Sequence, residues 1–142
     1  MKKIIFLCTG NSCRSQMAEG FARDLLGDRG VIVDSAGVQA DGLNTLAIQV
    51  MREVGIDIQS QKSKTIKSFD LNQFDLIVTV CDNARENCPL VNQSKIMHKN
   101  FDDPALSTGL IDEQLAVYRK IRDEIHLMVK ELVKNIIYYG KN

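Results

Sequence analysis

Apolar residues follow two patterns along the chain, and each pattern predicts a different kind of element. Continuous apolar runs rich in β-branched residues are typical of buried parallel strands, whereas apolar residues three and four positions apart give a helix one apolar face. The runs predict strands at residues 4–7, 31–33, 76–80 and 95–98. The spaced pattern predicts helices at residues 14–26, 45–54 and about 112–139.

Residues at the predicted helix ends agree with these boundaries. Asn44 is a suitable N-cap, and Gly27 and Gly55 stand where glycine commonly ends a helix. Strands and helices alternate, which implies a mostly parallel sheet covered on both sides. No internal repeat, low-complexity tract or linker divides the sequence. We therefore predict an α/β fold in which residues 1–142 form a single domain, a four-stranded parallel sheet with helices on both faces.

Length and charge narrow the classes of function. A chain of 142 residues can bury a core without metals or disulfides. Eighteen basic residues balance eighteen acidic ones, so no global charge attracts nucleic acid or an anionic membrane. The apolar run at 4–7 is too short for a signal peptide, and no run could span a bilayer. We expect a cytoplasmic protein with neither nucleic-acid nor membrane partners.

Four cysteines, at positions 8, 13, 81 and 88, are the most informative feature of the composition. In a reducing compartment, cysteines are expected to be catalytic, redox-active or metal-binding rather than joined in structural disulfides. Their spacing and setting must therefore indicate which of these roles they have.

The first two cysteines lie in a polar loop between the first predicted strand and the first predicted helix, where α/β proteins bind anions. Its candidate oxyanion-binding residues are Cys8, Thr9, Gly10, Asn11, Ser12, Cys13, Arg14 and Ser15. The helix dipole and the loop amides favour a thiolate at Cys8, to which Ser15 can donate a hydrogen bond. Arg14 offers a planar fork for two oxygens. The loop is therefore predicted to combine a nucleophile with groups that bind an oxyanion, and we call residues 8–15 the cradle.

The other two cysteines flank a short polar segment, residues 82–87. If this segment is helical, seven residues separate Cys81 and Cys88 by about 10 Å along the axis. A disulfide needs Cα atoms within roughly 7 Å, so the helix would have to unwind for the bond to form. Asp and Asn are poor helix formers, which suits a switch segment. In isolation, the same spacing also fits two unrelated reduced thiols.

Several motifs of this chain resemble those of the thioredoxin-coupled arsenate reductases, relatives of the low-molecular-weight tyrosine phosphatases. The matching segments are Cys8 to Gly20, Asp34 to Gly37, Val78 to Cys81, Cys88-Pro89, Phe101 to Pro104 and Arg122 to Ile125. The resemblance spans nearly the whole chain. It implies the low-molecular-weight phosphatase fold, arsenate as substrate, thioredoxin as the reductant and no tightly bound cofactor; we also expect a monomer.

The resemblance also implies roles for individual residues. Cys8 is the nucleophile, Arg14 the oxyanion ligand, and Asp103 the general acid, although an Asp-Asp-Pro sequence is also common turn chemistry. Reducing As(V) to As(III) needs two electrons, which a dithiol supplies on becoming a disulfide. Cys8 would attack arsenate, Cys81 would attack Cys8 and release arsenite, and Cys88 would resolve the Cys8–Cys81 bond. Thioredoxin would then reduce the Cys81–Cys88 disulfide.

Other polar residues receive lesser roles. Cys13 is expected to be a small packed residue, and His98 a structural one. Asn11, Glu19 and Ser35 match positions that help to hold potassium in some relatives. Lys64 stands where those relatives carry an acidic residue, which argues against a cation site, and we predict no metal site in this chain.

Two rival functions remain open at this stage. A tyrosine phosphatase could use the same loop, but such enzymes usually place aromatic residues around the site, whereas here Ala105 follows Pro104 and the chain has no Trp. A zinc-binding or redox-sensing module could use the four cysteines. Their spacings exceed the two to four residues usual between paired zinc ligands.

Overall fold

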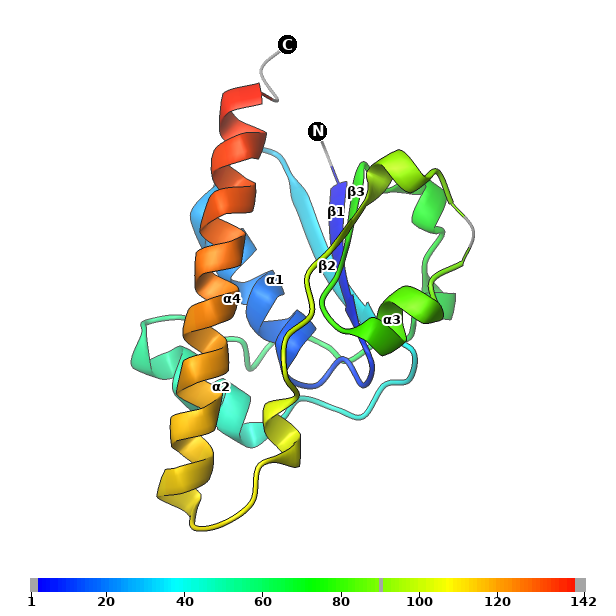
Figure 1. The fold of residues 1–142 in the computed structure, drawn as a ribbon. Helices are drawn as coiled ribbons and strands as arrows, with labels where there is room; N and C mark the ends of the chain where they lie inside the picture. Colours follow the sequence, from blue (N-terminus) through cyan, green and yellow to red (C-terminus); the bar gives the residue numbers. More distant parts are fainter. Residues whose placement is uncertain (1–2, 90, 140–142) are drawn as a thin grey trace.

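The computed structural model describes residues 3–89 and 91–139, and within them four strands form one parallel sheet (Figure 1). The strands are β1 (Lys3–Cys8), β2 (Ile32–Gly37), β3 (Leu76–Thr79) and β4 (Ile96–His98). Their order across the sheet is β2-β1-β3-β4. The predicted α/β class, single domain and four-stranded parallel sheet are confirmed.

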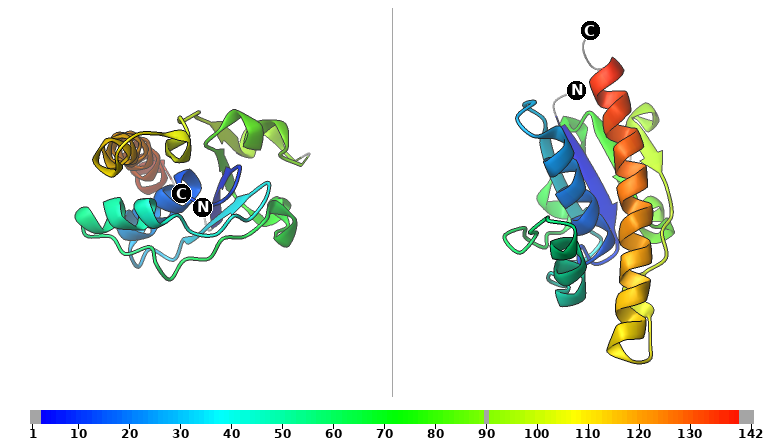
Figure 2. Two further views of the ribbon diagram at one scale, coloured as in Figure 1. Left: turned by 90° about the horizontal axis from the view of Figure 1, so that it is seen from below. Right: turned by 90° about the vertical axis from the view of Figure 1, so that its left-hand side faces the viewer.

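Four helices follow the strands in the described residues, and the apolar spacing predicted the three longest of them. The four are α1 (Arg14–Leu26), α2 (Thr45–Glu53), α3 (Asp82–Glu86) and α4 (Ile111–Tyr139). Single 3-10 turns are η1 (Ile66–Ser68), η2 (Leu71–Gln73), η3 (Gln93–Lys95) and η4 (Pro104–Leu106). Helices α1 and α4 lie side by side on one face of the sheet, and α3 lies on the opposite side (Figures 1 and 2).

Helix caps occur where the sequence indicated them. The side chain of Asn44 accepts hydrogen bonds from the backbone N–H groups of Leu46 and Ala47, which begins α2. Gly27 ends α1 with a φ of 52°, a conformation that glycine adopts without strain.

The prediction for β2 was wrong in its extent. The apolar run suggested residues 31–33, whereas the strand begins at Ile32 and continues to Gly37, paired with the whole of β1. The polar residues Asp34 and Ser35 interrupt the apolar run, so the run did not predict the second half of the strand. Ser35 is fully buried because its hydroxyl is hydrogen-bonded to Glu19 and Asn11, so a polar side chain occupies a strand position without an unpaired group.

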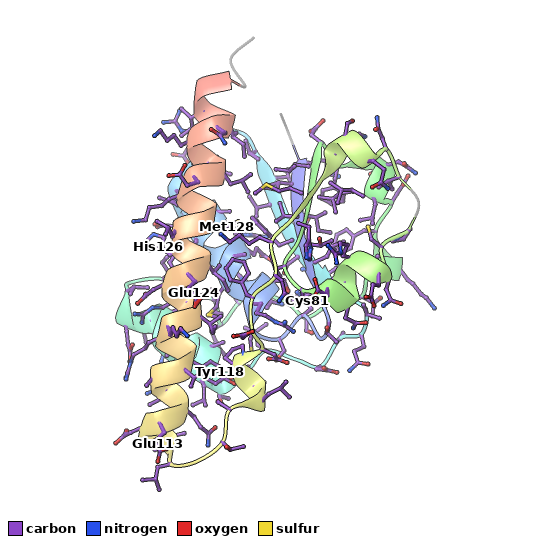
Figure 3. The ribbon with its side chains drawn as sticks, in the orientation of Figure 1. Cys81, Glu113, Tyr118, Glu124, His126 and Met128 are labelled. Atoms are coloured by element: carbon purple, nitrogen blue, oxygen red, sulfur yellow. The ribbon has the colours of Figure 1, made fainter. Side chains whose placement is uncertain are left out.

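The centre of the core is β1, whose residues Ile4, Ile5, Phe6 and Leu7 are completely buried. Covering helices on both faces explains why this strand is uniformly apolar. The long helix α4 is amphipathic: Tyr118 and Met128 are buried, whereas Glu113 and Glu124 are exposed (Figure 3). Among the described residues, no helix combines the length and apolar character needed to cross a membrane.

The order of the strands creates a ligand-binding position. The chain passes from β1 to β2 on one side and then crosses to β3 on the other side of β1. Parallel sheets bind ligands beyond the carboxyl ends of strands at such a switch point. Cys8 is the last residue of β1, and Cys81 follows β3 by two residues, so the fold brings both thiols to this edge.

The end of β2 packs closely against the loop that follows β1. A Cβ atom at Gly37 would lie 2.6 Å from Asn11 N and from Thr9 O, and closer still to Gln39 O. Because these neighbours are backbone atoms, they cannot move aside as a flexible side chain could. Gly37 therefore permits the loop to lie against β2.

We expect Gly37→Ala to lower the free energy of unfolding by about 1–3 kcal/mol, because the added methyl group forces backbone atoms apart. Urea denaturation followed by circular dichroism measures this loss. Val38→Ala, at the exposed next position, serves as the control and should cost about 0.5 kcal/mol or less. Equal stability of the Gly37→Ala variant and the unaltered protein would contradict the close approach.

Candidate active site

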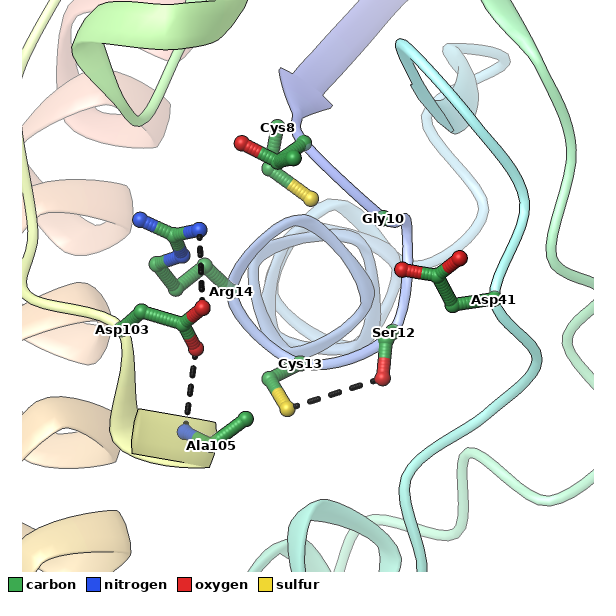
Figure 4. Close-up of a pocket in the computed structure, with 9 residues that line it drawn as sticks. Cys8, Gly10, Ser12, Cys13, Arg14, Asp41, Asp103 and Ala105 are labelled. Carbon is green, nitrogen blue, oxygen red and sulfur yellow. Dashed lines mark hydrogen bonds and ion pairs between the residues drawn. The ribbon is translucent and has the colours of Figure 1, made fainter. Parts of the chain in front are cut away.

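A small pocket opens at the loop between β1 and α1 (Figure 4). Its volume is about 90 Å³, and it is lined by Cys8, Thr9, Gly10, Ser12, Cys13, Arg14, Asp41, Asp103 and Ala105. The structure thus brings together the thiol of Cys8, the guanidinium of Arg14 and the carboxylate of Asp103, all three predicted site residues. Asn11 and Ser15 lie behind the pocket, fully buried.

The side chain of Asn11 fixes the shape of the loop. Its φ of 47° is unusual for a residue other than glycine, although Asn tolerates it better than most. Its Nδ2 group donates to Ser15 Oγ at 2.7 Å and to Ser35 Oγ at 2.9 Å. Its Oδ1 atom accepts from the Lys64 backbone at 2.8 Å and from Gln16 Nε2 at 3.0 Å. Four hydrogen bonds hold this one amide, and through it the loop.

Ser15 lies 2.7 Å from the Cys8 sulfur through its hydroxyl oxygen. Because that oxygen already accepts a proton from Asn11, its own proton is free to be donated to the sulfur. Burial raises the pKa of the Cys8 thiol. Hydrogen bonds from the Ser15 side chain and backbone, the charge of Arg14 and a hydrogen bond from the Asn11 backbone act to lower it. The groups of the loop therefore act as predicted, in favour of the thiolate, and burial acts against them.

Arg14 and Asp103 form one rim of the pocket. Arg14 donates to the Phe101 carbonyl at 3.0 Å, and its other terminal nitrogen lies 3.6 Å from Asp103 Oδ2. The second oxygen of Asp103 accepts from the Ala105 backbone at 3.0 Å and so begins the turn η4. Asp103 therefore takes part in turn chemistry and also lines the pocket with Cys8.

Asp41 lies on the other side of the loop and was not among the residues predicted from the sequence (Figure 4). Its backbone N–H donates to Gly10 O at 2.9 Å, and Gln39 Nε2 donates to both of its carboxylate oxygens, at 3.0 and 3.1 Å. No motif spacing marks this residue. The parallel pairing of β1 and β2 was the available signal, because it brings the segment after β2 beside the segment after β1.

Cys81 lies beside the cradle. Its sulfur is 3.3 Å from the Thr9 hydroxyl and accepts a hydrogen bond from the Ala84 backbone at 3.4 Å, capping α3. The segment between the two distal cysteines is helical over five residues, 82–86, which is the case considered in the sequence analysis. Cys88 lies just beyond its other end, partly buried, and this burial raises the pKa of its thiol.

Cys13 is buried, as expected, but it also lines the pocket. Its sulfur lies 4.0 Å from the Tyr118 hydroxyl of α4 and 3.7 Å from the Ser12 hydroxyl. Burial raises the pKa of Cys13 to about 11, so this thiol is protonated at neutral pH. All four cysteines are free.

The three residues that match potassium-binding positions bind one another and neighbouring groups instead. Ser35 donates to Glu19 at 2.6 Å and accepts from Asn11, while Arg23 pairs with Glu19 at 2.8 Å. The Asn11 carbonyl oxygen accepts two protein donors, as described above. The oxygens of Glu19, Ser35 and the Asn11 side chain thus each have at least one protein partner. Within the described residues, no three His, Cys, Asp or Glu side chains converge as a metal site.

Ser15→Ala should shift the ionisation of Cys8 to higher pH, because the variant lacks the hydroxyl that lowers the pKa of this thiol. The rate of iodoacetamide alkylation of Cys8, followed against pH by mass spectrometry, measures the shift. At neutral pH the variant should be alkylated more slowly. Ser12→Ala is the control, since its hydroxyl faces Cys13 and not Cys8. Superimposable curves for Ser15→Ala and the unaltered protein would show that this contact does not stabilise the thiolate.

Comparison with known proteins agrees with the geometry of this site. A model of the family of low molecular weight phosphotyrosine protein phosphatases matches residues 3–138. The arsenate reductase of Bacillus subtilis (strain 168) is 49% identical over 134 residues, which cover 94% of this chain and 96% of that protein.

Two solved structures share the fold over almost their whole length. An arsenate reductase in the oxidized state has a TM-score of 0.81 and 34% identity, covering 96% of this chain and 99% of the other. An arsenate reductase in the phosphate binding state has a TM-score of 0.76 and 32% identity, with the same coverage. The chain therefore belongs to the low molecular weight phosphotyrosine protein phosphatase family and, within it, to the group of proteins named arsenate reductases.

Proposed function

We propose that this enzyme reduces arsenate to arsenite, with Cys8 as the nucleophile and Cys81 and Cys88 as a disulfide relay. One observation carries the proposal: a second thiol, Cys81, lies 3.3 Å from the hydroxyl of Thr9, the residue directly after Cys8. Hydrolysis of a phosphate ester needs no electrons and hence no second thiol. Reduction of As(V) to As(III) needs two electrons, which two thiols supply.

In the first step the Cys8 sulfur attacks arsenic, and an As–O bond breaks. Ser15 stabilises the developing thiolate, and Arg14 and the loop amides bind the remaining oxygens. Asp103, on the rim of the same pocket, gives a proton to the departing hydroxide, which leaves as water. The product of this step is arsenic bound to the Cys8 sulfur, still as As(V).

In the second step the Cys81 sulfur attacks the Cys8 sulfur. A disulfide forms, the S–As bond breaks, and its electron pair stays on arsenic, which leaves as arsenite, As(III). The Cys88 sulfur then attacks Cys81, which releases Cys8 as a thiolate and leaves the Cys81–Cys88 disulfide. The two electrons gained by arsenic equal those lost by two thiols.

An external dithiol must return the protein to its reduced form. The family resemblance implies thioredoxin, and the proposed relay is consistent with it, because the protein would resolve its own disulfide and present a finished one. The test is arsenate-dependent NADPH oxidation with thioredoxin and its reductase, compared with glutathione and glutaredoxin. Turnover with thioredoxin and none with glutaredoxin is the expected result.

The rival phosphatase function is disfavoured by the pocket itself. Among the described residues that line it, none is aromatic, and Ala105 stands at the mouth. A volume of about 90 Å³ is enough for a tetrahedral oxyanion, and no aromatic side chain among the lining residues would stack against a phenyl ring outside it. We expect weak hydrolysis of small aryl phosphates as a side reaction. Metal analysis of the purified protein tests the zinc-binding alternative.

Cys8→Ser should lower both arsenate reduction and hydrolysis of para-nitrophenyl phosphate by several orders of magnitude, since both reactions need the same sulfur nucleophile. The coupled NADPH assay and the release of para-nitrophenol measure the two activities. Either activity at a level near that of the unaltered protein would exclude Cys8 as the nucleophile.

Cys88→Ser should abolish multiple turnover but allow each protein molecule to release arsenite once, because the reaction stops at the Cys8–Cys81 disulfide. Rapid quenching and mass spectrometry detect that bond, and arsenic speciation measures the arsenite. Hydrolysis of para-nitrophenyl phosphate is the internal control and should be unchanged, because hydrolysis has no electron demand. Parallel loss of hydrolysis and reduction would instead indicate that Cys88 is structural.

A further inference from the structure

The imidazole of His98, in β4, contacts both β3 and α3. We call α3, which lies between Cys81 and Cys88, the relay helix. Its Nδ1 atom lies 2.7 Å from the Thr79 hydroxyl at the end of β3, and its Nε2 atom lies 2.9 Å from Asp82 Oδ1 at the start of α3. His98 itself belongs to β4. Thr79 is completely buried, and the His98 side chain is 19% exposed, so the ring is held between a buried hydroxyl and a surface carboxylate.

The chemistry of the partners defines the hydrogen bond at the helix. A carboxylate can only accept, so the Nε2 atom of His98 carries the proton and donates to Asp82. Asp82 is the first residue of α3 and directly follows Cys81. The contact therefore attaches Asp82, the residue after Cys81, to strand β4 of the sheet.

Other contacts reinforce the same end of α3. The Asp82 backbone N–H donates to Asn100 Oδ1 at 3.1 Å, and Asn83 Nδ2 donates to Thr9 Oγ1 at 3.0 Å. Together with Cys81, which contacts Thr9, these bonds connect the first turn to β4, the cradle and the segment after β4.

The other end of α3 is held differently. The hydrogen bonds of the Asn87 side chain go back to Asn83, at 2.8 and 2.9 Å, and Cys88 N donates to Arg85 O at 3.5 Å. These bonds join residues within 83–88 to one another, so they would be lost if the relay helix unwinds. Among the described residues, the hydrogen bonds that tie α3 to the rest of the protein are thus at its N-terminal end, while Cys88 packs only partly against the core.

We propose that His98 is a positioning residue for the relay: it keeps the first turn of α3, and with it Cys81, beside the cradle while the rest of the helix unwinds. This inference rests on the proposed reductase function. Cys81 must stay near Cys8 to attack it, and Cys88 must then travel to Cys81. An anchor at Asp82 permits both events, because the Cys88 end moves while the Cys81 end stays in place.

The test compares His98→Ala, Asp82→Ala and the double variant with the unaltered protein in a single turnover. Reduced protein is mixed with arsenate and quenched in acid, and mass spectrometry follows formation of the disulfides. Each single variant should form the Cys8–Cys81 bond about tenfold more slowly, the factor expected from loss of a hydrogen bond to a charged group. The double variant should be no slower than either single one, because both substitutions remove the same contact. Asp82→Ala also removes an ion pair with Arg85 at 3.4 Å, but both of its side chains are exposed and such pairs contribute little.

Three controls separate positioning from general damage. Hydrolysis of para-nitrophenyl phosphate should be unchanged in all variants, which also reports a folded cradle. His98→Gln, which keeps an N–H donor at the end of a side chain of similar length, should recover part of the rate. Asn87→Ala, at the opposite end of α3, should not slow the reaction. Amide hydrogen exchange in the reduced protein should quicken at residues 82–84 in His98→Ala.

The possible outcomes are distinguishable. Unchanged disulfide formation in His98→Ala and Asp82→Ala would overturn the positioning role, and so would additive effects in the double variant or an equal loss of hydrolysis. If His98→Ala fails to fold, Asp82→Ala and His98→Gln decide the question, since Asp82 is exposed. If the unaltered protein forms no disulfide with arsenate at all, the relay, and hence the proposed function, is what fails.

Discussion

The hydrogen bonds of the Asn11 amide are the constraint on which the candidate site depends. They join the loop to α1, to β2 and to the segment at Lys64, and they hold Asn11 in a left-handed conformation. Because Asn11 donates to Ser15, the Ser15 proton is directed at the Cys8 sulfur. The shape of the backbone and the polarity around the nucleophile therefore have the same origin, and neither could change without the other.

Strand order explains why two distant thiols meet. Since β1 and β3 are neighbours in a parallel sheet, the residues that follow them lie at one edge, and Leu7 pairs with Thr79. Continuing that register places Thr9 beside Cys81, as their 3.3 Å contact shows. The loop lies between β1 and α1, whereas the position of the second thiol depends on the pairing of β1 with β3. In the proposed function, the strand next to the loop thus leads to the thiol that reduction needs and hydrolysis does not.

The pattern of apolar residues sufficed to predict α1, α2, α4, the parallel sheet and the loop. A buried strand or helix face produces this pattern among residues that are close in the sequence. The pattern failed where burial depended on distant partners. Ser35 extends β2 because Asn11 and Glu19 bind it, and Asp41 reaches the pocket through the turn after β2. The extent to which Cys8 is buried could not be predicted either, although Ser15 and Arg14, which act to lower the pKa of its thiol, were identified from the sequence.

A rigid cradle and a labile helix lie side by side in this fold, and their difference in stability follows from their contacts. The loop is held by hydrogen bonds to three other parts of the chain, most of them buried. Helix α3 has five residues, too few for an isolated helix to be stable, and Ala84 is its one fully buried side chain. Its attachment at Asp82 therefore decides which end can open. In the proposed relay, a helix anchored there keeps Cys81 beside Thr9 while its other end unwinds, so this local rearrangement would not disturb the groups proposed to bind the oxyanion.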